Sequence, residues 1–178
     1  FAEGRTSLPL SGKKVIVTRA RHQASVLQEA LEEKGAEAYL LPTIQLIPNE
    51  EVKTELETTL ESLPSYDWIL FTSPNAVEFF FSALRQRGKD SRHLAPCQIG
   101  ALGPMTAEAL SSYGITADFI PREYYAKVFA EEFIQRAKLT PVKRILLPNS
   151  ALASDDLSEL LSEAGIACHR LPLYQNTP

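Results

Sequence analysis

The sequence predicts an α/β protein with doubly wound parallel sheets, in which one domain is complete and a second is only partly present. Three observations support this prediction. Strands and helices alternate along the chain with short connections, the strands are short and apolar, and one strand–helix–strand stretch occurs twice. Short apolar strands between helices are typical of parallel sheets that helices cover on both faces.

The first half of the chain is predicted to alternate three strands with three helices. β-branched or aromatic runs mark the strands, and apolar residues at helical spacing mark the helices. Gly35 is placed to end the first helix, and Pro74 to open the third. The strands cover 13–19, 36–48 with a break at Pro42, and 66–73; the helices cover 22–35, 52–63 and 74–88.

The second half continues the alternation with four strands and three helices. The last helix is predicted to be capped by Ser154, because a serine hydroxyl accepts a hydrogen bond from the first helical turn. The segment ITADFIP, 115–121, is interpreted as a short strand. The strands cover 97–103, 115–121, 143–150 and 166–175; the helices cover 104–114, 123–137 and 154–165.

Residues 13–48 and 143–178 align without a gap, which predicts one strand–helix–strand unit used twice. Any two such units share leucine and glycine by pattern alone, but the matching prolines and glutamine favour a duplication. Identical residues meet at Lys13, Leu27, Glu29, Leu31, Glu33, Gly35, Leu41, Pro42, Gln45 and Pro48 of the first copy.

The repeat also predicts the domain boundaries. Three strands separate the two copies, and with the second copy they are expected to form one five-strand parallel sheet from about 66 to 172. The first copy lacks three strands of its own, and these are expected to follow Pro178. The chain is therefore divided into an N-terminal linker, 1–12, the first part of a discontinuous domain, 13–48, a complete domain, 49–172, and a return linker, 173–178.

The composition excludes several classes of protein. The net charge of −4 lacks the basic excess of nucleic-acid-binding proteins, and no apolar run approaches the roughly 20 residues of a membrane span. Cys97 and Cys168 are not clustered and predict two reduced, buried thiols in a cytoplasmic protein. The chain begins at Phe1 rather than Met, so either residues have been removed or an upstream segment is missing, and 1–12 lacks the apolar stretch of a secretory signal.

Five short motifs, taken in their order and spacing, resemble the uroporphyrinogen-III synthase family from about Gly12 to Pro178. These are VTRARHQASVLQEAL (17–31), FTSPNAV (71–77), GPMTAEAL (103–110), GITADFIP (114–121) and LPLYQ (171–175). The resemblance implies two flavodoxin-like domains joined by two linkers, one of them discontinuous. The start of the chain also resembles the linker that joins a uroporphyrinogen methyltransferase to the synthase in bacterial fusion proteins. This resemblance implies a possible upstream methyltransferase domain in the parent chain.

The resemblance implies a cyclising lyase of tetrapyrrole biosynthesis. Its substrate would be the small molecule hydroxymethylbilane, which loses water at ring A and closes with ring D inverted. The resemblance implies no cofactor and no metal, so catalysis would come mainly from holding the substrate in the reactive conformation. The 178-residue stretch alone is expected to be inactive, because the rest of the discontinuous domain would follow Pro178.

Candidate substrate contacts follow the predicted strand 66–73. Thr72, Ser73 and the amides at the start of the next helix suit a substrate carboxylate, because ligands bind at the carboxyl ends of parallel strands. Asn75 and Thr106, in matching motifs, are assigned the same role through the resemblance. The alternative is that Ser73 and Pro74 only cap the helix and form its first turn.

Tyr174 is the catalytic candidate. The resemblance places a tyrosine here that helps the ring A hydroxyl to leave by hydrogen bonding or proton donation. A phenol is a weak acid, so the expected effect is modest, and the alternative is a tyrosine packed at a strand end. Arg19 and Arg21 follow the first strand and suit the carboxylates of the substrate, unless they are simply exposed charges. At Ser154 the family often has an arginine, so a carboxylate contact there is not expected.

Two rival functions remain at this stage. One is a non-enzymatic sensor module, although the predicted strand ends lack the acidic cluster of a phospho-receiver. The other is a hinge-type small-molecule binding protein, although no export signal is present. The histidines 22, 93 and 169 have no metal-ligand spacing and are interpreted as surface or linker residues. No GxGxxG sequence supports a nucleotide or flavin site.

Overall fold

The computed structural model describes residues 8–19, 21–41 and 43–177, with the backbone alone at 21–23. The chain divides into two compact units. One unit comprises Phe1–Ile47 with Asn176–Pro178, and the other comprises Pro48–Gln175.

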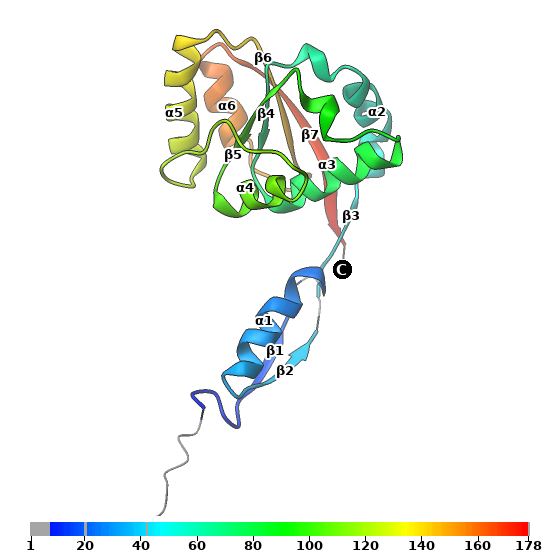
Figure 1. Ribbon diagram of the computed structural model, residues 1–178, viewed down its shortest axis with the longest axis vertical. Coiled ribbons are helices and arrows are strands. Elements are labelled where there is room, and N and C mark those ends of the chain that lie inside the picture. Colours follow the sequence, from blue (N-terminus) through cyan, green and yellow to red (C-terminus); the bar gives the residue numbers. More distant parts are fainter. Residues whose placement is uncertain (1–7, 20, 42, 178) are drawn as a thin grey trace, which may run out of the picture. The chain divides into compact units, whose positions relative to one another are not determined.

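The smaller unit is one helix packed on a two-stranded parallel sheet. Strand β1 (Lys14–Val17), helix α1 (Arg21–Glu33) and strand β2 (Glu37–Leu40) follow one another (Figure 1). Its buried residues are small or β-branched: Val17, Ala24 and Ala36. The predicted strand 36–48 is divided into β2 and a separate strand, β3 (Gln45–Pro48); the break expected at residue 42 lies outside the described residues.

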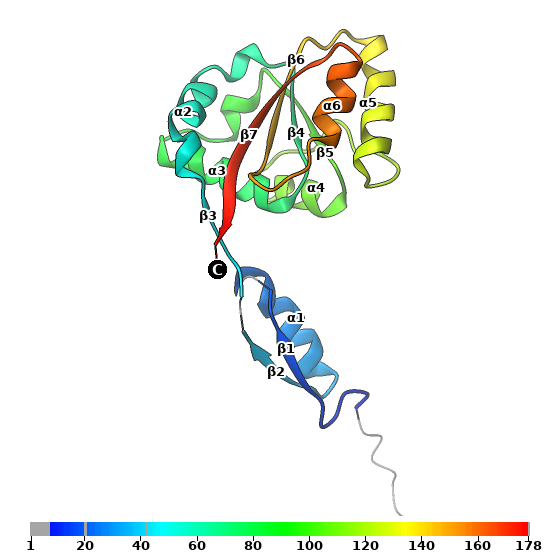
Figure 2. The ribbon, with the colours of Figure 1, turned by 180° about the vertical axis from the view of Figure 1, so that it is seen from behind.

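The five-stranded sheet has the order β3-β7-β6-β4-β5. Strands β4, β5, β6 and β7 pair in parallel, as expected for an α/β protein. Figure 1 and Figure 2 show helices on both sides of this sheet. The bounds are β4 Trp68–Phe71, β5 Gln98–Ala101, β6 Arg144–Ser150 and β7 Ala167–Thr177, with helices α2 Lys53–Glu61, α3 Pro74–Gln86, α4 Pro104–Ser111, α5 Ala126–Leu139 and α6 Asp156–Glu163, and short 3₁₀ turns at Glu50–Val52, Leu63–Ser65 and Ser91–Leu94.

The prediction that 115–121 forms the fifth strand of this sheet is wrong. The segment makes one isolated bridge, between Gly100 and Phe119, and β3 takes the fifth place at the opposite edge. The Ile99 amide donates to the Asp118 carboxylate, 2.7 Å away, so a side chain replaces the backbone carbonyl that a ladder would need. Pro121 then ends the segment without an amide hydrogen to pair.

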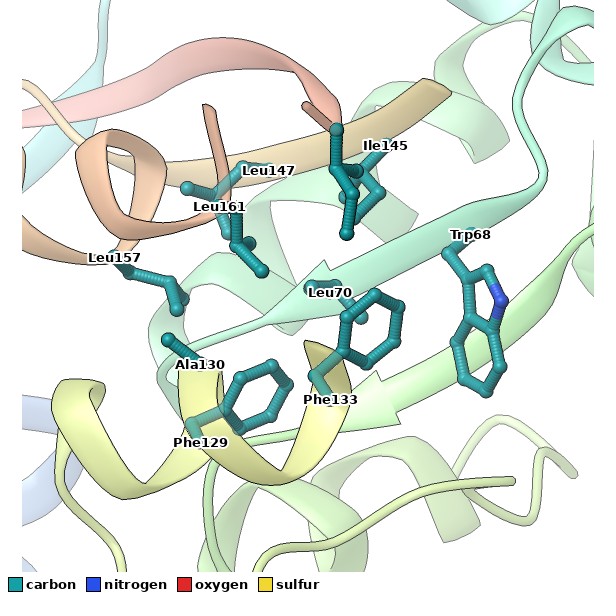
Figure 3. Close-up of a cluster of buried hydrophobic side chains, with 10 residues drawn as sticks. Trp68, Leu70, Phe129, Ala130, Phe133, Ile145, Leu147, Leu157 and Leu161 are labelled. Atoms are coloured by element: carbon teal, nitrogen blue, oxygen red, sulfur yellow. The ribbon is translucent and has the colours of Figure 1, made fainter. Parts of the chain in front are cut away.

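One hydrophobic core of the larger unit lies between the sheet and helices α5 and α6 (Figure 3). Alternate residues of β4 and β6 point to this face, as the two-residue period of a strand requires. Trp68 meets Phe133 edge-on, with ring centroids 5.0 Å apart, and burying a phenylalanine contributes about 1.5–3 kcal/mol. The cluster comprises Trp68, Leu70, Phe129, Ala130, Phe133, Ile145, Leu147, Leu157, Leu161 and Ile166.

Helix α3 covers the opposite face of the sheet. Phe71 of β4 packs edge-on against Phe80, with ring centroids 5.3 Å apart. The helix begins at Pro74, as predicted, because proline has no amide hydrogen to lose at a first helical position. The other predicted cap is wrong: α6 begins after Asp155, and the Ser154 hydroxyl donates instead to the Asp156 carboxylate.

The internal repeat is present in the strand pairing. Lys14 of β1 pairs with Glu37 of β2, and Arg144 of β6 pairs with Ala167 of β7. Positions 14 and 144, and positions 37 and 167, differ by the same 130 residues. The sequence alignment without a gap and the strand register therefore describe the same unit.

The helices of the two copies also end in the same way. Gly35 and Gly165 have φ angles of +91° and +82°, a left-handed conformation that glycine adopts without a steric penalty. Their amides donate to the backbone carbonyls of Glu32 and Ser162, which are again equivalent positions of the two copies. Each glycine thereby turns the chain from a helix into the strand that follows.

Candidate functional site

The carboxyl ends of β4, β5 and β6 lie at one edge of the five-stranded sheet. Because these strands are parallel, the loops that follow them emerge on the same side. The segment after β4 holds Thr72 and Ser73, and the segment after β5 holds Gly103. Ligands of open parallel sheets bind at this edge, so it is the candidate site.

Ser73 caps helix α3 and also contacts the catalytic candidate. Its hydroxyl oxygen accepts a hydrogen bond from the Ala76 amide at 3.1 Å. The same oxygen lies 3.2 Å from the Tyr174 hydroxyl, and either group can donate. Ser73 therefore caps α3 and occupies the Ala76 amide, and its contact with a substrate stays a prediction. The serine nevertheless joins α3 to Tyr174, which is 101 residues away.

The ring of Tyr174, a residue of β7, packs against helix α3. It is 6% exposed, and it stacks on Phe79 with ring centroids 4.8 Å apart and planes 12° apart. A stacked aromatic pair stabilises by about 0.5–1.5 kcal/mol beyond the area that it buries. The ring is therefore fixed, while its hydroxyl points to Ser73 at the edge of the sheet.

A β-bulge turns Tyr174 toward this face. Asn149 pairs with Pro172, but the next residue, Ser150, pairs with Tyr174, so Leu173 is an extra residue in β7. In a regular strand, residues 168 and 174 would share a face. Cys168 packs against the α5–α6 core, whereas Tyr174 stacks on α3. The bulge thus reverses the alternation and directs the phenol to the candidate site.

The other candidates of this region lie close to the same edge. Thr72 and Asn75 are half-buried, on either side of the start of α3. Thr106 is 3% exposed in the first turn of α4. Before this turn, a Cβ at Gly103 would lie 3.2 Å from the ring of Tyr124, so a larger residue there would displace this exposed ring by a few tenths of an ångström.

Arg19 and Arg21 belong to the smaller unit. Arg19 lies in a bend after β1 and is exposed. Arg21 is the first residue of α1, and its side chain lies outside the described residues. The structure therefore brings Ser73 and Tyr174 together, and Arg19 and Arg21 stay predictions.

Two residues beside these candidates, Phe79 and Tyr124, were not singled out from the sequence. Phe79 lies in the run FFF, 79–81, within the predicted helix 74–88. It lies four residues, about one helical turn, after Asn75 on α3, and that spacing could have identified it. Tyr124 gives no such signal, because its contact with Gly103 depends on the path of the chain after 115–121.

The loop between β6 and α6 contains Ser154 where the family often has an arginine, but the guanidinium of another arginine reaches this loop. Arg170 comes from the neighbouring strand β7, and its Nη2 donates to the Ala153 carbonyl at 3.0 Å. Its Nη1 forms an ion pair with the Asp155 carboxylate. This arginine joins β7 to the start of α6.

His169 is not the surface or linker residue that was expected. Its Nδ1 lies 2.5 Å from the Tyr66 hydroxyl, and its Nε2 lies 2.6 Å from the Glu55 carboxylate. This hydrogen-bonded chain joins β7 to α2 at the end of the sheet away from Tyr174. Among the described residues, no group of three or more His, Cys, Asp or Glu side chains is placed to hold a metal ion.

Both cysteines are free thiols. Cys97 is buried, as predicted, whereas Cys168 is only partly buried. Burial raises the pKa of the Cys97 thiol to about 11, with a smaller effect from the Asp67 charge, and burial raises that of Cys168 to about 11. Neither thiol is therefore an activated nucleophile. None of the helices in the described ranges is both long and apolar enough to cross a bilayer.

Comparisons with known proteins agree on one family. A family model described as "Uroporphyrinogen-III synthase HemD" matches residues 25–178. The chain is 35% identical to the "Porphyrin biosynthesis protein HemD" of Ruminiclostridium josui, over 93% of this chain and 32% of that protein. It is 30% identical to the uroporphyrinogen-III synthase of Synechococcus elongatus, over 94% of this chain and 62% of that protein. These matches do not favour a sensor or a hinge-type binding protein.

The fold has solved counterparts. A mutant uroporphyrinogen III synthase from Thermus thermophilus superposes with a TM-score of 0.65 at 20% identity, over 93% of this chain and 63% of that chain. At this identity the likeness is one of fold, a mixed α/β fold with mainly parallel sheets. The chain spans between about a third and just under two thirds of the curated relatives cited above.

Proposed function

This chain belongs to the uroporphyrinogen-III synthase family, and we propose that the protein converts hydroxymethylbilane into uroporphyrinogen III in tetrapyrrole biosynthesis. The reaction is a cyclisation with loss of water, in which ring D is inverted. The match of the family model over 25–178 and the name of the Synechococcus elongatus relative support this proposal. The whole protein would be a cyclising lyase.

The observation that supports this function best is the pair formed by Ser73 and Tyr174. Two hydroxyls lie 3.2 Å apart at the carboxyl edge of a parallel sheet, and one of them is on a ring fixed by stacking on Phe79. A fixed phenol can hydrogen-bond the departing ring A hydroxyl in one orientation, which favours loss of water from one bound conformation. Ser73 then acts as a positioning residue for Tyr174.

The remaining candidates are proposed to hold the substrate. Thr72, Asn75 and Thr106 lie at or beside the same edge and would contact substrate carboxylates. Arg19 and Arg21 would supply guanidinium groups, which suit carboxylates because they donate two parallel hydrogen bonds. No step of this proposal needs a metal or a cofactor, because the positions of the reacting carbons decide the product.

The proposed architecture is that of two flavodoxin-like domains joined by two linkers. One domain would be discontinuous and begin with 13–48, and the other would cover 49–172, with 173–178 as the return linker. The shared register of the two strand–helix–strand copies supports this arrangement. An upstream methyltransferase domain and a cytoplasmic location are further parts of the proposal, the latter supported by two free thiols.

Incubation of the full-length protein with hydroxymethylbilane tests the function. The uncatalysed reaction closes ring D without inversion and therefore gives a different isomer. Chromatography separates the two isomers. We expect the inverted isomer, and a product identical to that of the uncatalysed reaction would refute the proposal.

A separate variant tests the role of Tyr174. Tyr174→Phe keeps the ring on Phe79 and removes only the hydroxyl, so kcat should fall about tenfold or more while the product isomer stays the same. Tyr125→Phe is the matched control, because Tyr125 is 68% exposed and should leave kcat unchanged. If both variants keep the full rate, Tyr174 has no part in the loss of water.

A further inference from the structure

A hollow lies at the opposite end of the sheet from the candidate site. It has a volume of about 240 Å³, and its wall includes Trp68 and Gln98, the first residues of β4 and β5. The end of α5 and the segment that follows it complete the wall with Phe133, Arg136, Thr140 and Val142. None of these residues takes part in the proposed synthase reaction.

Three of the polar groups in this hollow are donors, and the Gln98 side chain adds both a donor and an acceptor. Arg136 and Thr140 are exposed to solvent. Within the ranges that the structure describes, the Trp68 indole N–H, the Arg136 guanidinium and the Thr140 hydroxyl have no hydrogen-bond or carboxylate partner. In Figure 3 the indole nitrogen of Trp68 lies on the side of the ring away from Phe133. The guanidinium carbon of Arg136 lies 5.3 Å from the centre of the Trp68 ring.

The carboxylate that precedes Trp68 in the sequence already accepts two hydrogen bonds from the backbone. Asp67 precedes Trp68, and its Oδ2 accepts hydrogen bonds from the amides of Lys143 at 2.7 Å and Arg144 at 2.9 Å. These two amide donors offset the negative charge of Asp67. Glu132, one turn before Arg136 on α5, forms an ion pair with Arg122. The Arg136 charge is therefore available to a ligand, and an Arg guanidinium is suited to a carboxylate.

The rest of the wall is apolar apart from the Gln98 side chain. Trp68 is 3% exposed and Phe133 is fully buried, so both belong to the rigid core of Figure 3. A rigid apolar wall with a few convergent polar groups is the usual form of a small-ligand site. The volume is below the 300–1,000 Å³ common for such sites, which restricts the ligand to about one ring.

From this combination we propose that the hollow binds a small aromatic carboxylate. The carboxylate would accept hydrogen bonds from Arg136 and from the Trp68 indole, and the ring would lie against Val142 and the indole edge. Arg136 is exposed, so the ion pair would stay in contact with water. This site is independent of the synthase reaction, because it lies at the amino ends of the strands and uses other residues.

The test uses benzoate as the probe and Trp68 as the reporter. The chain has one tryptophan, so the intrinsic fluorescence comes from the wall of the proposed site. We expect a saturable change in this fluorescence with benzoate, and a much weaker one with benzamide, which has the same shape without the charge. No saturable change up to about 10 mM benzoate would overturn the proposal.

Variants show whether the change arises at this site. Arg136→Gln should raise the Kd for benzoate about tenfold or more, the loss expected for a charge-assisted hydrogen bond. The matched control is Arg85→Gln, because Arg85 also ends a helix and stacks over an aromatic ring, Tyr113, with its guanidinium carbon 5.4 Å from the ring centre. Equal affinities for benzoate in these two variants would refute the site.

Trp68→Phe tests the indole donor by ligand-observed NMR. The phenylalanine keeps an aromatic wall without the N–H, so benzoate should bind several-fold more weakly while benzamide changes less. An unchanged affinity for benzoate would show that the indole does not donate. Thermal unfolding of each variant confirms that the core of the sheet is intact before binding is measured.

Discussion

Replacing Tyr66 with phenylalanine should destabilise the larger unit. The Tyr66 hydroxyl lies 2.5 Å from Nδ1 of His169, whose Nε2 lies 2.6 Å from the Glu55 carboxylate. The neutral imidazole can accept a hydrogen bond from Tyr66 and donate one to Glu55 at the same time. The variant removes the donor and leaves the imidazole nitrogen without a partner in a site that is only partly open to water.

The structure isolates the size of this effect. Phenylalanine keeps the stacking on His169, with ring centroids 5.8 Å apart, and the place under the Arg144 guanidinium, whose carbon is 4.4 Å from the ring centre. Tyr66 is 2% exposed, so water replaces its hydroxyl poorly. The loss should therefore be that of one part-buried hydrogen bond, about 1–3 kcal/mol. Glu55→Gln should cost less, about 0.2–1 kcal/mol, because the Glu55 side chain is 48% exposed.

Urea unfolding followed by circular dichroism measures these differences. The free energies of unfolding of Tyr66→Phe and of the control Tyr125→Phe are compared, with equal slopes against urea as the condition for the comparison. Tyr125 is 68% exposed, so its variant should stay close to the parent. If the two variants are equally stable, the hydrogen-bonded chain does not stabilise the fold. A double variant, Tyr66→Phe with Glu55→Gln, should show a non-additive loss, because both partners share His169.

Three further predictions concern single positions. Iodoacetamide should alkylate Cys97 and Cys168 about a hundredfold more slowly in the native protein than in urea at pH 8, because burial raises both thiol pKa values to about 11; equal rates would contradict this. Gly165→Ala should lower the free energy of unfolding by about 1 kcal/mol, because its φ is +82° while the space for a methyl group is open; an unchanged urea midpoint would contradict this. The hydrogen bond from Arg92 lowers the pKa of Asp90 to about 2, below its ordinary 3.8. Its stabilising effect should therefore be present above about pH 4 and fade as the pH falls through about 2, and carboxyl NMR of Arg92→Gln should show the Asp90 midpoint rising.

The local signals in the sequence located most helices and strands. Ser73 and Pro74 marked the start of α3, and the shared spacing of Gly35 and Gly165 predicted two equivalent helix ends. These features depend on residues that are close together in the chain. The fold class followed from them, because a parallel sheet requires the helices between its strands.

Sequence patterns did not predict the features that depend on a partner far away in the chain. Residues 115–121 alternate like a strand, but the Asp118 carboxylate takes the Ile99 amide, and β3 supplies the fifth strand instead. The environment of His169 depends on Tyr66, which is 103 residues away. Pairings over such distances leave no periodic pattern, so they could not be predicted from one sequence.

The extra residue in β7 has a consequence for insertions and deletions. Substitution of Leu173 by another apolar residue keeps the count of residues between Pro172 and Tyr174, and the phenol stays on the α3 face. Deletion of Leu173 restores the two-residue alternation and carries the phenol through the sheet to the α5–α6 side, although no residue of the site has been changed. The number of residues in this stretch, more than its composition, therefore decides on which face of the sheet the tyrosine lies.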